Sequence, residues 1–301
     1  MRRRPVTLAA ASAVALIGVG AVGLRTVISR QAAIARRRIG KPLGEQALDA
    51  DRVWRRKKHP GRPAELLLLG DSIAAGLGAG RRRDTLGARL AKGIARECGR
   101  PVRLRTAAVV GSETAALPVQ LGSLPDGYRA DIAVIVVGGN DVTHRVPAAR
   151  AACQLGEIVR TLRSDGIPVV VGTCPDLGTL RAIPQPLRAL AARSSRQLAA
   201  AQAAAVSRAG GHVVALARAV GPVFAERPEE MFSVDRFHPS ALGYRRTAEA
   251  LLPAVRAALA EESVAAGFAD VRLDACPTAP RSSASAVPRD SSRRSAEPSS
   301  S

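Results

Sequence analysis

Short apolar runs of strand length, most of them ending at a glycine, alternate with longer helical stretches through the middle of this chain. Runs that are apolar or β-branched almost throughout are typical of strands buried on both faces of a sheet. Alternation with helices predicts a three-layer α/β/α fold with a mainly parallel, five-stranded sheet. The runs are Ala64 to Leu69, Val102 to Val110, Ile132 to Val137, Ile167 to Val171 and His212 to Leu216; the helical stretches are Thr85–Glu97, Pro147–Ser164, Leu187–Arg208 and Ala241–Ala260.

Ser72 follows the first of these runs in the segment LLLLGDSIAAGLGAG. Ligands of parallel sheets bind beyond the carboxyl ends of the strands, and Gly70 ends the strand two residues earlier. We therefore expect the Ser72 hydroxyl at the ligand-binding edge, where it suits a nucleophile. The alternative is that Asp71 or Ser72 only caps the helix that follows.

A second motif, DRFHP, contains Asp235 and His238 in a turn that Pro239 stiffens. A serine hydroxyl is a poor nucleophile unless a base accepts its proton, and an imidazole base works best when a carboxylate fixes its tautomer. The spacing lets Asp235 meet one ring nitrogen of His238 while the other faces Ser72. The alternative is that the motif is only a structural turn, since an Asp three residues before a His is common by chance.

A third motif, GGND, places Asn140 after the run that ends at Val137. Its side-chain amide can donate to a developing oxyanion together with the backbone N–H groups of Gly111 and Ser72. The alternative is that Asn140 or Asp141 caps the next turn.

Three further polar residues lie within or next to these motifs and have no role in this chemistry. We interpret Asp71 and Asp141 as loop-holding residues and His144 as structural.

Together, GDS at 70–72, Gly111, GGND at 138–141 and DRFHP at 235–239 resemble the four motifs of the SGNH or GDSL hydrolase family, in order. The forms GGNDVTH and DRFHPSALGY are similar to those of exported actinobacterial esterases. This resemblance implies a flavodoxin-like fold, Ser72 as nucleophile, His238 as base and Asp235 as its orienting partner. It implies an oxyanion hole of Ser72, Gly111 and Asn140. The sequence departs from the pattern of the related α/β-hydrolases, because Gly70-Asp71-Ser72-Ile73-Ala74 lacks the second glycine of GxSxG. This departure argues against a sharp nucleophile elbow.

The N-terminal region predicts export. Residues 6–24 are uncharged and apolar, follow three arginines, and are long enough to span a bilayer. Residues 1–30 are thus expected to form a signal peptide or a membrane anchor, which gives an exported, membrane-anchored or cell-envelope protein. The arginines after the run outnumber those before it, which favours a cytoplasmic-facing orientation. We expect a basic linker over residues 31–62, the hydrolase domain over 63–262 and a disordered Ser/Pro/Arg-rich tail over 263–301.

Charge and composition narrow the classes of partner. The net charge is +20, but the basic runs cluster near the chain ends, and no nucleic-acid-binding motif accompanies them. We expect no nucleic-acid partner. Aromatic residues make up 2% of the chain and four cysteines lie far apart, so no cofactor or metal is expected. One or two disulfides remain open.

The predicted activity is hydrolysis of carboxylic esters through an acyl-serine. Short acyl chains are expected because no long insertion between the motifs supplies a lid or an acyl tunnel. The partner is then a small-molecule or lipid ester, with membrane association through residues 6–24 and an open oligomeric state. The alternatives are an acyltransferase, a lysophospholipase or a thioesterase with the same site, or a membrane-tethered basic binding module whose hydrolase site is vestigial.

Overall fold

The structure, a computed structural model, describes the backbone of residues 23–274 and side chains from Gly23 to Glu261. The chain divides into two compact units, Met1–Glu262 and Ser263–Ser301, and the sheet and every side chain discussed below lie in the first. Of the expected signal peptide or anchor, residues 1–30, the first 22 residues lie outside the described residues, and residues 23–30 belong to a helix. None of the helices within residues 23–274 is both long and apolar enough to cross a membrane.

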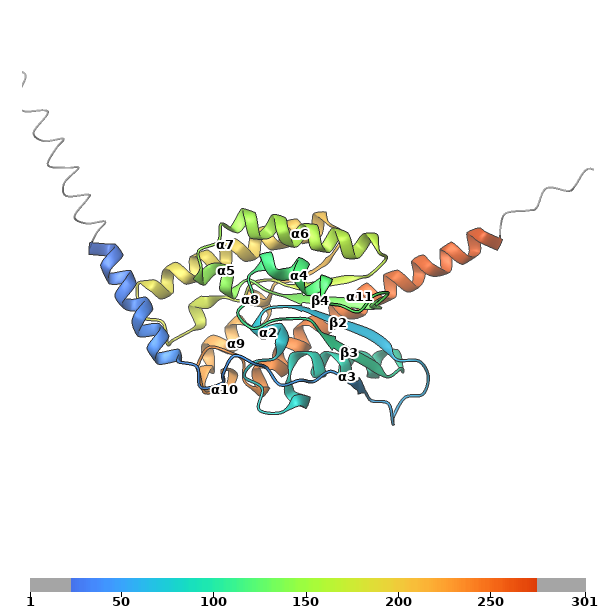
Figure 1. Ribbon diagram of the computed structural model, residues 1–301, viewed down its shortest axis with the longest axis horizontal. Helices are drawn as coiled ribbons and strands as arrows, with labels where there is room; N and C mark the ends of the chain where they lie inside the picture. The colour runs from blue at the N-terminus through green and yellow to red at the C-terminus, as the bar shows by residue number, and fades with distance from the viewer. Residues whose placement is uncertain (1–22, 275–301) are drawn as a thin grey trace, which may run out of the picture. The chain divides into compact units, whose positions relative to one another are not determined.

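A six-stranded sheet forms the centre of the first unit, in the order β1-β3-β2-β4-β5-β6 (Figure 1). The five predicted strands are present and pair in parallel. The sixth strand, β1, was not predicted and pairs antiparallel with β3 at the sheet edge. Two residues are too few to show a periodic pattern, and β1 is recognised as a strand only by its pairing with β3. The strands are β1 Val53–Trp54, β2 Ala64–Gly70, β3 Val102–Thr106, β4 Ile132–Val136, β5 Val169–Gly172 and β6 His212–Val214.

Strand β2 occupies the point where the strand order reverses, because its neighbours are β3 on one side and β4 on the other. Ligands of open α/β sheets bind at such a switch point. Strand β3 ends at Thr106, four residues before the predicted end at Val110. The chain nevertheless stays beside β2, since the N–H groups of Ala107 and Val109 donate to carbonyls of that strand. The segment that follows β3 therefore reaches the end of β2.

Helices cover both faces of the sheet (Figure 1). On one face lie α3, Leu86–Cys98, and the part of α11, Ala241–Asp274, that belongs to this unit; on the other lie α6, Ala148–Ser164, and α7, Leu187–Arg208. Alternate leucines of β2 enter the two cores, which explains its unbroken apolar sequence. Helix α11 is longer than predicted and includes residues 263–274 of the expected tail.

A helix over residues 23–39 packs on the same unit. Ala35 is buried in a cluster with Leu177, Leu180 and Ile183. Gln31 Oε1 accepts the backbone N–H of Leu187 at 2.9 Å. The segment expected as a linker, residues 31–62, thus contains the end of this helix and strand β1.

Three of the four cysteines, Cys98, Cys153 and Cys174, are free thiols. Cys276 lies outside the described residues. Burial raises the pKa of the Cys174 thiol well above its usual value, so this side chain is a packing residue.

Candidate active site

Ser72 is the first residue of a one-turn helix, α2, Ser72–Ala75, which begins directly after β2. Asp71 caps this helix, since its Oδ1 accepts the N–H of Ile73 at 2.9 Å. Because Asp71 takes the capping role, the Ser72 hydroxyl is left for another partner. Gly70 makes the turn possible: its φ is +132°, and a Cβ there would lie 1.9 Å from the carbonyl oxygen of Val136.

His238 and Asp235 complete a chain of hydrogen bonds to Ser72. The Nε2 atom of His238 lies 3.0 Å from Ser72 Oγ, and its Nδ1 lies 2.5 Å from Asp235 Oδ2. Asp235 Oδ1 also accepts the backbone N–H groups of Phe237 and His238, each at 3.0 Å. Burial acts to raise the pKa of Asp235, but these hydrogen bonds outweigh it and lower the pKa below its usual value. The carboxylate therefore stays ionised and holds the imidazole.

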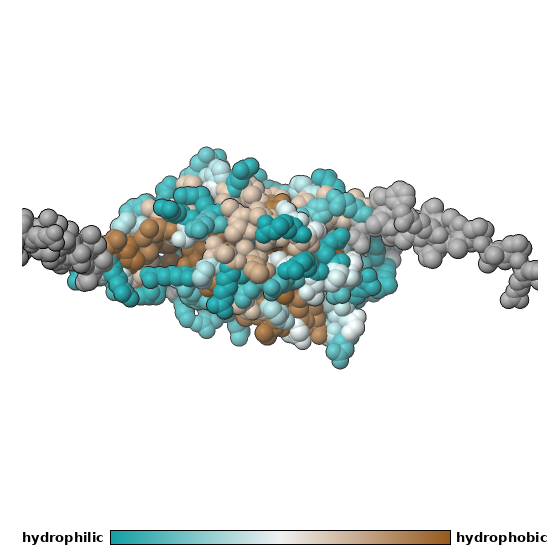
Figure 2. Space-filling view, turned by 90° about the horizontal axis from the view of Figure 1, so that it is seen from above, coloured by the Kyte–Doolittle hydropathy of each residue, from teal (hydrophilic) through white to brown (hydrophobic). Residues whose placement is uncertain are grey.

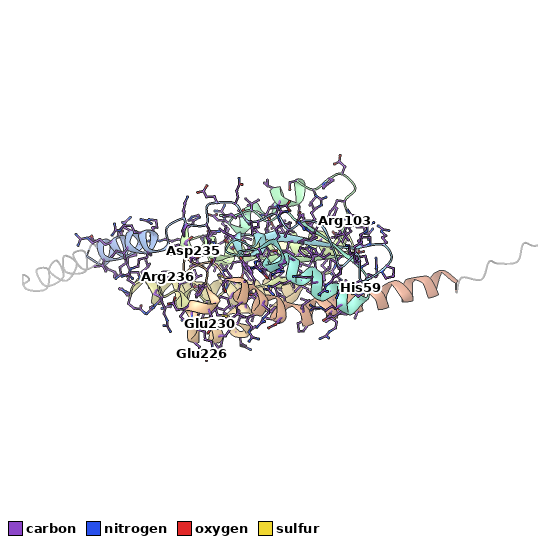
Figure 3. The ribbon with its side chains drawn as sticks, turned by 90° about the horizontal axis from the view of Figure 1, so that it is seen from below. His59, Arg103, Glu226, Glu230, Asp235 and Arg236 are labelled. Atoms are coloured by element: carbon purple, nitrogen blue, oxygen red, sulfur yellow. The ribbon has the colours of Figure 1, made fainter. Side chains whose placement is uncertain are left out.

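The turn that carries this pair is a small hairpin. Ser233 N–H donates to the carbonyl of His238, and Ser240 N–H donates to the carbonyl of Met231, both at 2.8 Å. Arg236 at the turn has a φ of +55°, an uncommon conformation for a residue with a side chain. Figure 3 shows Asp235 and Arg236 on the side of the molecule where Glu230 lies, far from Arg103 on β3.

Two contacts fix the hairpin against the loop that follows α2. Tyr244, fully buried near the start of α11, donates its hydroxyl to the carbonyl of Leu77 at 2.6 Å. Gly78 has a φ of +102°, and a Cβ there would lie 2.6 Å from the Pro239 carbonyl oxygen and 3.0 Å from the Cβ of His238. The close approach of the serine loop and the histidine turn therefore requires a glycine.

Asn140 lies in α5, Gly139–Thr143, just beyond β4. Its Nδ2 donates to the carbonyl of Ser112 at 3.0 Å, which uses one of its two N–H bonds and leaves the other for a ligand. Asn140 lines one pocket together with Ser72 and His238. Gly111, at φ +84° in the turn closed by the Ser112 N–H on the Val109 carbonyl, is not among the described residues that line this pocket.

The remaining polar residues near the site have structural partners. Asp141 Oδ2 accepts both the N–H and the hydroxyl of Thr114, each at 3.1 Å. His144 Nδ1 lies 2.7 Å from Glu113 Oε1. Burial raises the pKa of Asp71 to about 6. Each side chain thus holds a loop around the site.

Two buried glutamines support the site and were missed by sequence reasoning. Gln120 in α4, Leu117–Gly122, bonds both backbone groups of Gly70. Gln202 donates to the carbonyl of Val137 at 3.0 Å and accepts the N–H of Cys174 at 2.7 Å, which holds the end of β4. The only sequence signal is a glutamine among apolar neighbours, which does not indicate a partner.

The pocket beside Ser72 is small and mostly apolar. Its volume is ≈ 60 Å³. The rings of Phe224 and Phe232 meet edge to face with centroids 5.0 Å apart, and both line the pocket. Its further apolar walls include Leu180, Leu216 and Val220.

The described side chains contain no group of three or more His, Cys, Asp or Glu residues that could hold a metal ion. Ser72, His238 and Asn140 supply a hydroxyl, an adjacent base and a nearby amide donor, which are the groups that nucleophilic attack on a carbonyl uses.

Residues 68–246 match the GDSL-like Lipase/Acylhydrolase family. The chain is also 40% identical over 270 residues to the GDSL-like esterase Rv1075c of Mycobacterium tuberculosis (strain ATCC 25618 / H37Rv), an alignment that covers 87% of this chain and 86% of that protein.

Solved structures with the same fold include the lipase/acylhydrolase from Enterococcus faecalis, with a TM-score of 0.52, 20% identity, and coverage of 63% of this chain and 94% of that one. A catalytic mutant of Axe2, an acetylxylan esterase from Geobacillus stearothermophilus, has a TM-score of 0.52, 18% identity, and coverage of 65% and 95%. TesA has a TM-score of 0.51, 22% identity, and coverage of 64% and 97%. At these identities the likeness establishes the fold alone.

Proposed function

The chain belongs to the GDSL-like lipase/acylhydrolase family and is a carboxylic ester hydrolase, and we propose that it cleaves short-chain acyl esters through an acyl-serine on Ser72. The observation that supports this most is the continuous hydrogen-bond chain from Asp235 through His238 to Ser72. It supplies the base that a serine hydroxyl needs and the carboxylate that orients the base.

In the proposed cycle, His238 Nε2 accepts the proton of Ser72 Oγ while Oγ bonds to the ester carbonyl carbon. The negative charge that develops on the carbonyl oxygen is stabilised by the N–H groups of Ser72 and Gly111 and by the free N–H of Asn140. One such donor contributes about 3–4 kcal/mol to transition-state stabilisation. His238 then gives its proton to the departing alcohol. A water molecule deprotonated by His238 attacks the acyl carbon, and His238 returns that proton to Ser72 Oγ as the acid leaves.

The size of the pocket beside Ser72 supports a short acyl group. The acyl part is bonded to Ser72 from the attack until water releases the acid, so it has to fit next to this residue. The pocket of ≈ 60 Å³, whose walls include the rings of Phe224 and Phe232, suits a short acyl group better than a long one. Its apolar walls favour an aliphatic acyl group over a charged one.

Ser72→Ala tests the proposal. We expect hydrolysis of p-nitrophenyl acetate to fall by about 10³-fold or more and fluorophosphonate labelling to disappear, because the nucleophile is gone. Unfolding by urea should be nearly unchanged. The matched control is Ser207→Ala, an exposed serine on α7, which should keep wild-type turnover and labelling.

A p-nitrophenyl series from acetate to dodecanoate tests the acyl length. We expect kcat/KM to be highest for the shortest acyl groups. A maximum at dodecanoate would contradict the short-chain assignment, and wild-type turnover in Ser72→Ala would contradict the nucleophile.

We further propose that the protein acts outside the cytoplasm, on the basis of the apolar sequence over residues 6–24. Fluorophosphonate labelling of separated cell fractions tests this. The labelled protein is expected in the membrane or extracellular fraction, and a label confined to the cytoplasm would refute export.

A further inference from the structure

A second cavity lies between the helix of residues 23–39 and the segment from η3, Leu177–Thr179, into the first turns of α7. We call it the N-helix groove. Its volume is ≈ 870 Å³, within the range of about 300–1,000 Å³ typical of small-molecule sites. The walls from the two sides are aliphatic and include Ile28, Ala32, Ala35, Ile183, Leu187 and Leu190.

The groove adjoins the candidate active site. Asn140, Leu177 and Phe237 line both the groove and the small pocket beside Ser72. Phe237 also packs edge to face against the His238 ring, with centroids 4.9 Å apart. Phe237 is therefore a wall that the groove and the small pocket share, and it lies beside the imidazole that protonates the departing alcohol in the proposed cycle.

The charges around the groove exclude a cationic ligand. Arg36, Lys41 and Arg145 line it, and its described lining contains no Asp or Glu. At the start of the same helix, Leu24 is 56% exposed and Val27 is 43% exposed. Figure 2 shows hydrophobic surface gathered at the end of the molecule where this helix lies. An uncharged aliphatic chain fits the aliphatic walls of the groove and the exposed apolar side chains of Leu24 and Val27.

We propose that the N-helix groove binds the aliphatic chain of the alcohol part of the ester, so that the preferred substrates are short-chain acyl esters of long-chain alcohols. This rests on the proposed function. The acyl group belongs in the small pocket because it stays on Ser72, whereas the alcohol oxygen receives its proton from His238. An alcohol chain that passes Phe237 enters the groove directly.

The test is a series of alkyl acetates, from ethyl to octyl acetate, with acetic acid release followed in a pH-stat. The readout is the ratio of kcat/KM for octyl acetate to kcat/KM for ethyl acetate within each protein. Each methylene that leaves water is expected to raise kcat/KM about two- to fourfold. The full chain should therefore give a ratio of about 50 or more.

Two substitutions change the groove in different ways. Ala32→Trp fills the groove with a large side chain. Leu190→Asp places a charge in the groove, and because the side chain of Leu190 is 47% exposed, the carboxylate can stay in contact with water and the fold should lose little stability. Each should lower the ratio at least about tenfold. The matched controls are Ala33→Trp, on the same helix but outside the lining, and Val119→Asp, at a 75% exposed side chain of α4; both should keep the wild-type ratio. Both kcat/KM values come from the same protein preparation, so a smaller fraction of folded protein lowers both values equally and leaves the ratio unchanged.

The outcomes separate the two proposals. A wild-type ratio near one, with ethyl acetate cleaved, overturns the groove assignment and leaves the esterase assignment intact; a groove filled by another part of this chain gives the same result. A high ratio that survives both Ala32→Trp and Leu190→Asp also overturns it. Failure to cleave either acetate, together with no fluorophosphonate label on Ser72, defeats the proposed function itself.

Discussion

Gln120 bonds both backbone groups of Gly70: its Oε1 accepts the N–H and its Nε2 donates to the carbonyl, each at 2.8 Å. The same Nε2 lies 3.3 Å from Ser112 Oγ, and the Ser112 carbonyl accepts the side chain of Asn140. One buried amide thus connects the backbone that precedes the candidate nucleophile with the turn that orients the candidate oxyanion donor.

Gln120→Leu tests this connection. The N–H and carbonyl of Gly70 lose these partners at a buried position, which is expected to lower the free energy of unfolding by about 1–3 kcal/mol. We also expect kcat to fall about tenfold or more. Loss of the bonds to Gly70 can displace the Ser72 hydroxyl, and a displacement of a fraction of an ångström is enough to slow its attack on the substrate. Urea unfolding and p-nitrophenyl acetate kinetics measure the two effects.

Gln154→Leu is the matched control for that substitution. Gln154 lies on α6, and its Oε1 has no hydrogen-bond partner among the described residues. Both stability and kcat should stay close to wild type. Equal losses in the two variants would mean that Gln120 acts only through the volume of its side chain.

Asp235→Asn should reduce kcat by about 10⁴-fold, since a neutral amide no longer fixes the His238 tautomer or stabilises its charged form. The binding of a substrate analogue should change little. The comparison is with Asp126→Asn, which alters an exposed carboxylate in the loop before β4. A kcat within tenfold of wild type for Asp235→Asn would remove this residue from the mechanism.

Gly78→Ala should move the histidine turn away from the serine. The added Cβ would lie 2.6 Å from the carbonyl oxygen of Pro239, at a backbone φ of +102°. We expect a decrease in kcat of about 10- to 100-fold. Gly80→Ala is its control, because a Cβ at Gly80 meets nothing within 4 Å. Identical kinetics of the two variants would show that the loop is free to shift.

Asp71 should make stability depend on pH. Burial raises its pKa to about 6 in the folded chain, so the native state binds this proton more tightly than the unfolded state. Its contribution to stability is fully present below the unfolded pKa and is lost as pH rises through about 6. Between pH 5 and pH 7 the free energy of unfolding should fall by about 1 kcal/mol through this group.

Asp71→Asn keeps an acceptor for the Ile73 N–H and removes the titration. Urea unfolding at pH 5 and pH 7 should show the decrease in the wild type and not in the variant, after the change common to both is subtracted. The same pH dependence in both proteins would mean that another group is responsible.

Regular elements could be predicted from the sequence because their signals are local. Helix α7 has the predicted bounds, Leu187–Arg208, and α11 begins where predicted, after Ser240, whose hydroxyl accepts the N–H groups of Leu242 and Gly243. Strand β2 was recognisable because burial on both faces leaves an unbroken run of leucines. Likewise, strand ends at one edge of a parallel sheet are close in space, so Ser72 and Asn140 could be expected near each other.

Features that depend on distant partners were not predictable. Strand β1 exists only through its pairing with β3, and a sequence pattern does not show that Gln120 reaches Gly70. The N-helix groove is a further case. No insertion between the motifs supplies a lid or a tunnel, whereas one wall of the groove comes from residues 23–39, before the first motif. Packing between segments far apart in sequence leaves no local periodicity.

Ser72 and His238 are 166 positions apart in the chain. During synthesis on the ribosome, Ser72 is therefore made early, and its base, His238, is added only when nearly the whole domain has been synthesised. An incomplete nascent chain carries an ordinary serine and cannot become acylated by cellular esters. Esterase activity thus reports that the final hairpin and α11 have docked, and the cell is exposed to the reactive hydroxyl only in a finished molecule.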